Sequence, residues 1–172
     1  AEGFLFPDTY QFPKGMSEET IIKKMVSRFR EVSAGDLEMG AKAAGLSVKE
    51  VVTLASIVEK ETGDASERPR IARVFLNRLK KGIPLQSDPT VIYGIKDFNG
   101  NLTRKDLLTK TPYNTYQRRG LPPGPIANPG ADSIKAALYP EEGPYLYFVS
   151  RNDGTHYFSR TLSEHNMAVY KY

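Results

Sequence analysis

Residues 47–63 read SVKEVVTLASIVEKETG, and this stretch has the clearest helix start in the chain. Ser47 and Glu50 form an S-x-x-E capping box, a pattern with which helices begin. Apolar residues then follow at helical spacing, and these are Val51, Val52, Leu54, Ala55, Ile57 and Val58. We therefore predict an amphipathic helix whose apolar face packs in the core and which ends near Glu61 and Gly63.

Similar start and stop signals place further helices on both sides of this one. The predicted helices cover residues 17–29, 36–44, 66–81 and 128–138, with a last helix that opens at a Thr161–Glu164 capping box. One β-hairpin is also predicted. Residues 145–149 and 156–158 suit strands, and Asn152-Asp153-Gly154 between them is a strong turn signal.

Residues 83–130 have a different composition, rich in Pro, Gly, Asn, Asp and Thr, with only short helices expected near 89–94 and 103–108. An irregular segment of this length is usually functional or disordered. Its aromatic residues and its lack of like-charge runs argue against disorder. The predicted fold class is therefore α+β, mainly helical, with about six helices, a small β-hairpin and a long irregular site-forming loop region.

The length and net charge of the chain limit the classes of protein to which it can belong. The 172 residues suit one domain, residues 1–172. No apolar run approaches 18 residues, so no membrane segment is expected in this chain. The opening residues 1–4 lack signal-peptide character and suggest a domain excised from a longer protein. The net charge of +4 suits an anionic polymer, either nucleic acid or cell-wall glycan, and equally suits a plain solvated basic surface.

Several catalytic chemistries lack the residues that they need. Cysteine is absent, which excludes thiolate catalysis and Cys-based zinc sites. There is no G-x-S-x-G elbow and no glycine-rich nucleotide motif. His156 and His165 do not have metal-ligand spacing, and we expect both to be structural hydrogen-bonding residues. No metal and no cofactor is therefore expected, and carboxylates remain as the candidates for catalysis.

Glu59 and Glu61 flank the apolar face near the C-terminal end of the helix that opens at Ser47. Partial burial and the negative end of the helix dipole both raise the pKa of a carboxyl group there. A raised pKa suits a general acid that donates a proton to a leaving oxygen. The alternative is that both are rim residues paired with nearby Lys or Arg, and helical spacing does not choose between the two glutamates.

Two polar clusters lie in the irregular region. Tyr113, Asn114 and Tyr116 offer aromatic faces and an amide, a set that suits a sugar ring with an N-acetyl group. The second cluster consists of Gln86, Ser87 and Asp88. The alternative for both clusters is ordinary turn chemistry, which favours the same residue types.

The chain resembles the endolytic murein transglycosylase family (MltG, YceG-like) nearly from end to end. The matching strings are ASIVEKETGDASER (55–68), VFLNRL (74–79), LQSDPTVIYG (85–94), PYNTY (112–116), GLPPGPIANPGADSIKAA (120–137) and PYLYFV (144–149). The resemblance covers the catalytic domain, without the family's upstream membrane anchor and LysM-like region. It implies that Glu61, the second Glu of E-K-E-T, is the catalytic residue.

The resemblance also implies the reaction and its setting. Members of this family cut the β-1,4 bond between N-acetylmuramic acid and N-acetylglucosamine in nascent peptidoglycan, without water, and leave 1,6-anhydro ends. The implied location is the extracytoplasmic face of the bacterial cytoplasmic membrane. The implied partners are glycan strands and cell-wall synthases (penicillin-binding proteins), and a nucleic-acid partner is not expected.

The order of motifs is also similar to that of the wider lysozyme-like lytic transglycosylases. In those enzymes a helix-terminal Glu-Ser precedes Met-Gln and Ala-Tyr-Asn motifs. Here Thr62 stands for the Ser, Leu85 for the Met and Pro112 for the Ala. The resemblance implies a lysozyme-like catalytic domain and substrate-binding roles for Gln86, Tyr113 and Asn114, to which the polar clusters add Asp88 and Tyr116.

Two rival functions remain at this point. One is a hydrolytic muramidase in which Asp88 serves as a second carboxylate, because hydrolytic glycosidases usually need two. The other is a glycan-binding module without catalysis, in which Glu61 has no chemical role. Mass analysis of the product separates the first rival from the transglycosylase, and any turnover of purified glycan excludes the second.

Overall fold

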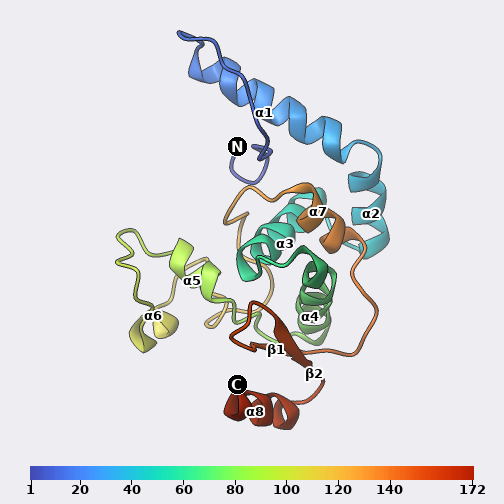
Figure 1. The fold of residues 1–172 in the computed structure, drawn as a ribbon, viewed down its shortest axis with the longest axis vertical. Helices are drawn as coiled ribbons and strands as arrows, with labels where there is room; N and C mark the ends of the chain where they lie inside the picture. The colour runs from blue at the N-terminus through green and yellow to red at the C-terminus, as the bar shows by residue number, and fades with distance from the viewer.

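The computed structural model describes residues 1–172 and confirms the α+β class. The helices are α1 (Glu18–Ser33), α2 (Asp36–Ala44), α3 (Val48–Glu61), α4 (Arg68–Lys81), α5 (Asp88–Tyr93), α6 (Arg104–Leu108), α7 (Ala131–Leu138) and α8 (Leu162–Lys171), with a 3₁₀ turn, η1 (Ala65–Glu67). The strands are β1 (Tyr147–Ser150) and β2 (His156–Ser159). The chain is therefore mainly helical, with one small hairpin (Figure 1).

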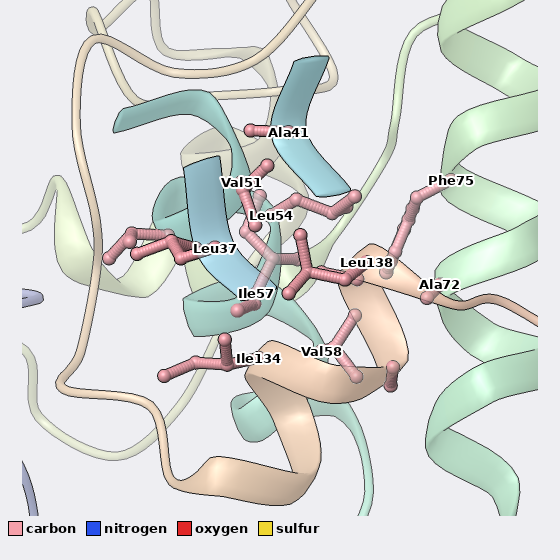
Figure 2. Packing of buried hydrophobic residues seen from close by; sticks show 14 of the residues in the cluster. Leu37, Ala41, Val51, Leu54, Ile57, Val58, Ala72, Phe75, Ile134 and Leu138 are labelled. Atoms are coloured by element: carbon pink, nitrogen blue, oxygen red, sulfur yellow. The ribbon is translucent and has the colours of Figure 1, made fainter. Parts of the chain in front are cut away.

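Helix α3 is the central element of the core. Its predicted capping box is present, since the Ser47 hydroxyl accepts from the Glu50 amide and the Glu50 carboxylate accepts from the Ser47 amide. Every residue of α3 from Val51 to Val58 is buried. In Figure 2 its apolar side chains meet Leu37 of α2 and Leu138 of α7. Burying each such side chain contributes about 1.5–3 kcal/mol, so this packing fixes the helix that carries Glu61.

Two helix starts differ from the prediction. Helix α7 begins at Ala131 rather than 128, because the Asn128 side chain accepts hydrogen bonds from the amides of Gly3 (2.7 Å) and Leu5 (3.2 Å). Helix α4 begins at Arg68 rather than 66, because residues 65–67 form the 3₁₀ turn η1. In both places side-chain hydrogen bonds set a boundary that hydrophobic periodicity does not report.

The hairpin pairs β1 with β2 in antiparallel register, with Tyr147 opposite Ser159 and Ser150 opposite His156. The first strand starts two residues later than predicted. The carbonyls of Tyr145 and Leu146 instead accept bonds from α4 side chains. Helix α8 packs on the hairpin, and Figure 1 shows this C-terminal unit beside α4.

The irregular region is ordered and includes the two short helices expected in it, α5 and α6. In Figure 1 these helices and their loops extend to one side of the central helices α3, α4 and α7. Among all the helices, none is both long and apolar enough to cross a membrane.

Candidate active site

A polar pocket lies where α3, α4, the 85–88 segment and the C-terminal unit meet. Its volume is about 370 Å³. The lining residues are Glu61, Arg78, Leu85, Gln86, Asp88, Tyr116, Phe148 and His165. The structure thus brings together four of the residues predicted from sequence, Glu61, Gln86, Asp88 and Tyr116, and adds Arg78, Phe148 and His165. A larger apolar pocket between α1 and α2 contains no comparable set of titratable groups around a buried carboxyl.

Glu61 is the last residue of α3, and its position follows from the packing of that helix. The next residue, Thr62, is buried and extended, so the chain leaves the helix axis directly after Glu61. The Glu61 side chain is partly exposed toward the pocket, and its Oε1 accepts a hydrogen bond from the Ser87 hydroxyl. One carboxylate oxygen is thereby held in place, and Oε2 has no hydrogen bond from the protein.

The pocket changes the acidity of Glu61. Burial raises the pKa of its carboxyl group from the ordinary value of 4.5 to about 7, and the nearby Asp88 carboxylate acts in the same direction. The hydrogen bond from Ser87 and the charges of His156 and Arg78 oppose this rise in pKa. Burial is the largest of these effects, so a substantial fraction of Glu61 keeps its proton at neutral pH, as a general acid requires.

Ser87 is itself fixed by a buried hydroxyl network. Its amide donates to Thr115 Oγ1 (3.0 Å), and its carbonyl accepts from Thr90 Oγ1 (2.6 Å). The hydroxyls of Thr90 and Thr115 lie 2.8 Å apart. All three residues are buried, so the donor to Glu61 cannot move without breaking several hydrogen bonds.

Arg78 organises another part of the pocket lining. Its Nη1 donates to the carbonyl of Leu85 (2.8 Å) and to Gln86 Oε1 (3.1 Å), and its Nε donates to the carbonyl of Leu146 (2.7 Å). Gln86 adopts a φ of +54°, a left-handed conformation that is strained for a residue with a side chain. The guanidinium therefore holds a strained loop and the C-terminal unit together at the pocket.

Asp88 and Tyr116 form the rim near Glu61. The Tyr116 hydroxyl donates to Asp88 Oδ1 at 2.6 Å. Burial together with this bond raises the pKa of the Tyr116 hydroxyl far above its usual range, so Tyr116 remains a neutral donor. Asp88 is exposed to solvent and supplies the second carboxylate of the pocket.

The C-terminal unit supplies the last wall through Phe148 of β1 and His165 of α8. The His165 ring stacks on Tyr147, with ring centroids 5.2 Å apart. Burial, and then the charge of Arg78, lowers the pKa of His165, which favours the neutral imidazole. The sequence predicts a structural hydrogen-bonding role for His165, but neither ring nitrogen bonds to the protein, and the ring faces the pocket.

Glu59 has a different role from Glu61. Its Oε2 accepts from the Gly130 amide (3.0 Å) and the Ser133 hydroxyl (2.7 Å), and its Oε1 accepts from Arg68 (3.2 Å). Gly130 is the N-cap residue of α7, so Glu59 joins the end of α3 to the start of α7. Glu59 is therefore paired with a nearby Arg, as the alternative interpretation of the two glutamates predicts.

Comparison with known proteins places the chain in a family. A sequence model of the YceG-like family matches residues 1–171. The chain belongs to the YceG-like family. It is 46% identical over 173 residues to an endolytic murein transglycosylase of Bacillus subtilis (strain 168) and 33% identical over 174 residues to one of Streptococcus pneumoniae (strain D39). These alignments cover 99% and 98% of this chain.

A solved YceG-like structure shares the fold. A 2.6 Å crystal structure of a YceG-like protein from Listeria monocytogenes superposes with a TM-score of 0.85 at 44% identity and covers 96% of this chain. The chain spans 53% of that protein, 48% of the Bacillus protein and 31% of the Streptococcus protein. The YceG-like domain described here therefore corresponds to part of each relative.

Two predicted binding residues lie outside the pocket of this YceG-like domain. Asn114 is fully buried. Its Nδ2 donates to the carbonyls of Asp106, Leu107 and Thr109, and its Oδ1 accepts from the Tyr116 amide. The amide of Asn114 therefore bonds inside the protein, and a contact between Asn114 and substrate stays a prediction.

Tyr113 also lies outside the pocket. Its ring packs against Tyr93 of α5, with ring centroids 4.6 Å apart, and against the hydrophobic core. The structure does not bring Tyr113 to Glu61, so a contact with glycan at Tyr113 stays a prediction.

Proposed function

We propose that this domain is an endolytic lytic transglycosylase that cuts peptidoglycan strands between N-acetylmuramic acid and N-acetylglucosamine. The observation that carries the proposal is Glu61, a carboxyl group whose pKa is raised to about 7 and which faces a polar pocket. The names of the Bacillus and Streptococcus relatives support the same activity. Because the chain spans about half or less of those relatives, the proposal concerns the domain.

The first step is proton donation. Protonated Glu61 gives its proton to the glycosidic oxygen as the bond from the muramyl C1 to that oxygen breaks. The leaving N-acetylglucosamine takes the electron pair and departs as an alcohol. The Ser87 hydroxyl, already bonded to Oε1, stabilises the carboxylate that forms.

The second step forms the 1,6-anhydro ring of the product. The muramyl C6 hydroxyl attacks C1, a 1,6-anhydro bond forms, and the hydroxyl proton returns to the Glu61 carboxylate. Because the nucleophile belongs to the substrate, proximity favours the attack and no second catalytic carboxylate is needed. Water is not consumed, and Glu61 is regenerated as the acid.

The other pocket residues support this cycle without a covalent role. Gln86 and Tyr116 offer polar groups to the sugar, while Phe148 offers an aromatic face. Neutral His165 adds a ring without a positive charge beside the developing oxocarbenium ion. We also propose, from the family resemblance, a site of action at the outer face of the cytoplasmic membrane beside cell-wall synthases.

A hydrolytic muramidase is the second candidate, and the presence of Asp88 in the same pocket favours it. Mass analysis of the products from uncrosslinked glycan decides between the two reactions. The proposal predicts anhydro ends, which are lighter by one water than reducing ends. Products carrying only hydrated reducing ends would establish the muramidase instead, and the absence of any turnover would leave a binding module.

A further inference from the structure

The positive charge of this protein is concentrated in one segment. Residues 94–119 contain six Lys and Arg and two Asp, a net charge of +4, which equals the net charge of the whole chain. The rest of the chain is balanced. We call residues 94–119 the basic lobe. It includes α6, which lies to one side of the central helices in Figure 1.

The cations of the basic lobe have no acidic partners. Elsewhere the arginines Arg28, Arg68 and Arg70 form ion pairs with Asp or Glu. No basic side chain of the lobe has a carboxylate within 4.0 Å, and five of the six are exposed. The six are Lys96, Arg104, Lys105, Lys110, Arg118 and Arg119. The lobe therefore presents uncompensated positive charge to its surroundings.

Asn114 links the chain segments of the basic lobe through hydrogen bonds to their backbone. Its buried amide bonds to three carbonyls of residues 106–109, and Gln117 Nε2 donates to the carbonyl of Leu107 at 2.8 Å. These bonds join the end of α6 to the chain segment that leads to Arg118 and Arg119. Arg119 also lies against Gly82, next to the exposed Lys80 and Lys81. The fold thus links the segments of the basic lobe that carry these exposed cations.

The basic lobe also exposes a large apolar side chain. Leu108, the last residue of α6, is 70% exposed and lies between Lys105 and Lys110 in the sequence. A soluble polyanion offers phosphate or carboxylate to the cations but nothing to the leucine. The surface of an anionic bilayer offers both, because headgroup phosphates lie directly above acyl chains.

We propose that the basic lobe binds the surface of a membrane rich in anionic phospholipid, with Leu108 inserted at the boundary between headgroups and acyl chains. The lobe also contains Tyr116, which bonds to Asp88 at the pocket. Contact through the lobe therefore holds the pocket close to the bilayer. This proposal goes beyond the reaction at Glu61 and does not depend on it.

The test is co-sedimentation of the 172-residue protein with vesicles of phosphatidylglycerol and phosphatidylcholine, compared with phosphatidylcholine alone. We expect the protein to sediment with the anionic vesicles and to be released as the salt concentration is raised. Lys105→Glu with Lys110→Glu weakens binding by about tenfold or more, and Leu108→Ser weakens it by about tenfold. All three positions are exposed, so thermal melts should match the wild type.

The matched control is Lys42→Glu with Lys135→Glu, two exposed and unpaired lysines on α2 and α7 that give the same change in net charge. This control should keep most of the binding. Equal binding to neutral vesicles, or an equal loss in the control, would overturn the proposal. So would full binding by Leu108→Ser together with complete competition by polyphosphate, which would identify a general polyanion surface. Glu61→Gln should bind vesicles normally, so failure of the reaction and failure of membrane binding are separate results.

Discussion

The Ser87 hydroxyl donates a hydrogen bond to Oε1 of Glu61, and this bond joins the end of α3 to the 85–88 segment. Ser87 is buried, whereas its neighbours Gln86 and Asp88 are exposed at the pocket. A donor aimed at a carboxylate favours the ionised form, so Ser87 opposes the effect of burial on the pKa of Glu61. The acidity of Glu61 is therefore a balance that single substitutions should shift in known directions.

Substitutions at Ser87 and Asp88 should move the pH profile in opposite directions. Since Glu61 must be protonated to act, kcat/KM of the wild type should fall above a pKa near 7. Ser87→Ala removes a donor that lowers the pKa of Glu61, so the fall moves to higher pH. Asp88→Asn removes a charge that raises this pKa, so the fall moves to lower pH. Initial rates on soluble glycan across pH 5–9 measure both shifts. Loss of all turnover in Asp88→Asn at every pH would instead identify Asp88 as a second catalytic carboxylate.

Glu61 should make the protein less stable as the pH rises. Its carboxyl group titrates near 4.5 when unfolded and near 7 when folded, so between these values the folded chain binds more protons. The free energy of unfolding therefore falls across this window, by about 3 kcal/mol from this group. Glu61→Gln has no proton to lose, so it should match the wild type near pH 4 and exceed it in stability at pH 8. Urea titrations at both values test this, and an equal difference at both would contradict the raised pKa.

Glu59→Gln should cost stability rather than chemistry. The substitution removes the charge that pairs with Arg68 and weakens the bond from the Gly130 amide. We expect a loss of about 1–3 kcal/mol in the free energy of unfolding, with kcat per folded molecule nearly unchanged. Denaturant melts and rates measured well below the midpoint separate the two effects. A large loss of kcat in fully folded Glu59→Gln would show that Glu59 acts in the reaction.

Asn114→Ala should destabilise the basic lobe. The amide makes four hydrogen bonds in a buried position, and its removal leaves three carbonyls and one N–H without that partner. We expect a loss of about 3 kcal/mol or more. Hydrogen exchange at residues 104–110 should increase first, since these residues are the ones that Asn114 holds. A variant with unchanged exchange and melting but weaker glycan binding would instead support the predicted substrate-binding role of Asn114.

The sequence predicts those features of the fold that depend on residues close together in the chain. The capping box at Ser47, the apolar spacing through Val58 and the turn at residues 152–154 all depend on near neighbours, and each is present in the structure. The start of α7 was misplaced because Asn128 bonds to the amide of Gly3, a partner 125 residues away. The periodicity of apolar residues does not report hydrogen bonds between residues so far apart in the sequence.

The pocket was predicted only in part for the same reason. Glu61, Gln86 and Asp88 lie in short motifs, and in the structure all three line one pocket. Arg78 could have been found, because it lies on the apolar face of α4 in line with Ile71 and Phe75, where a charge needs a special reason. His165 gave no such signal, because its place at the pocket depends on how the C-terminal unit packs.

In the proposed mechanism Glu61 alone supplies the proton for bond cleavage. The most direct test of this role is the rate at which Glu61→Gln forms anhydro-ended product from uncrosslinked glycan, with Glu59→Gln as the matched substitution two residues away. We expect no detectable anhydro product from Glu61→Gln, which still folds, and near wild-type product per folded molecule from Glu59→Gln. Formation of anhydro ends by folded Glu61→Gln at a rate close to the wild type would contradict this role of Glu61.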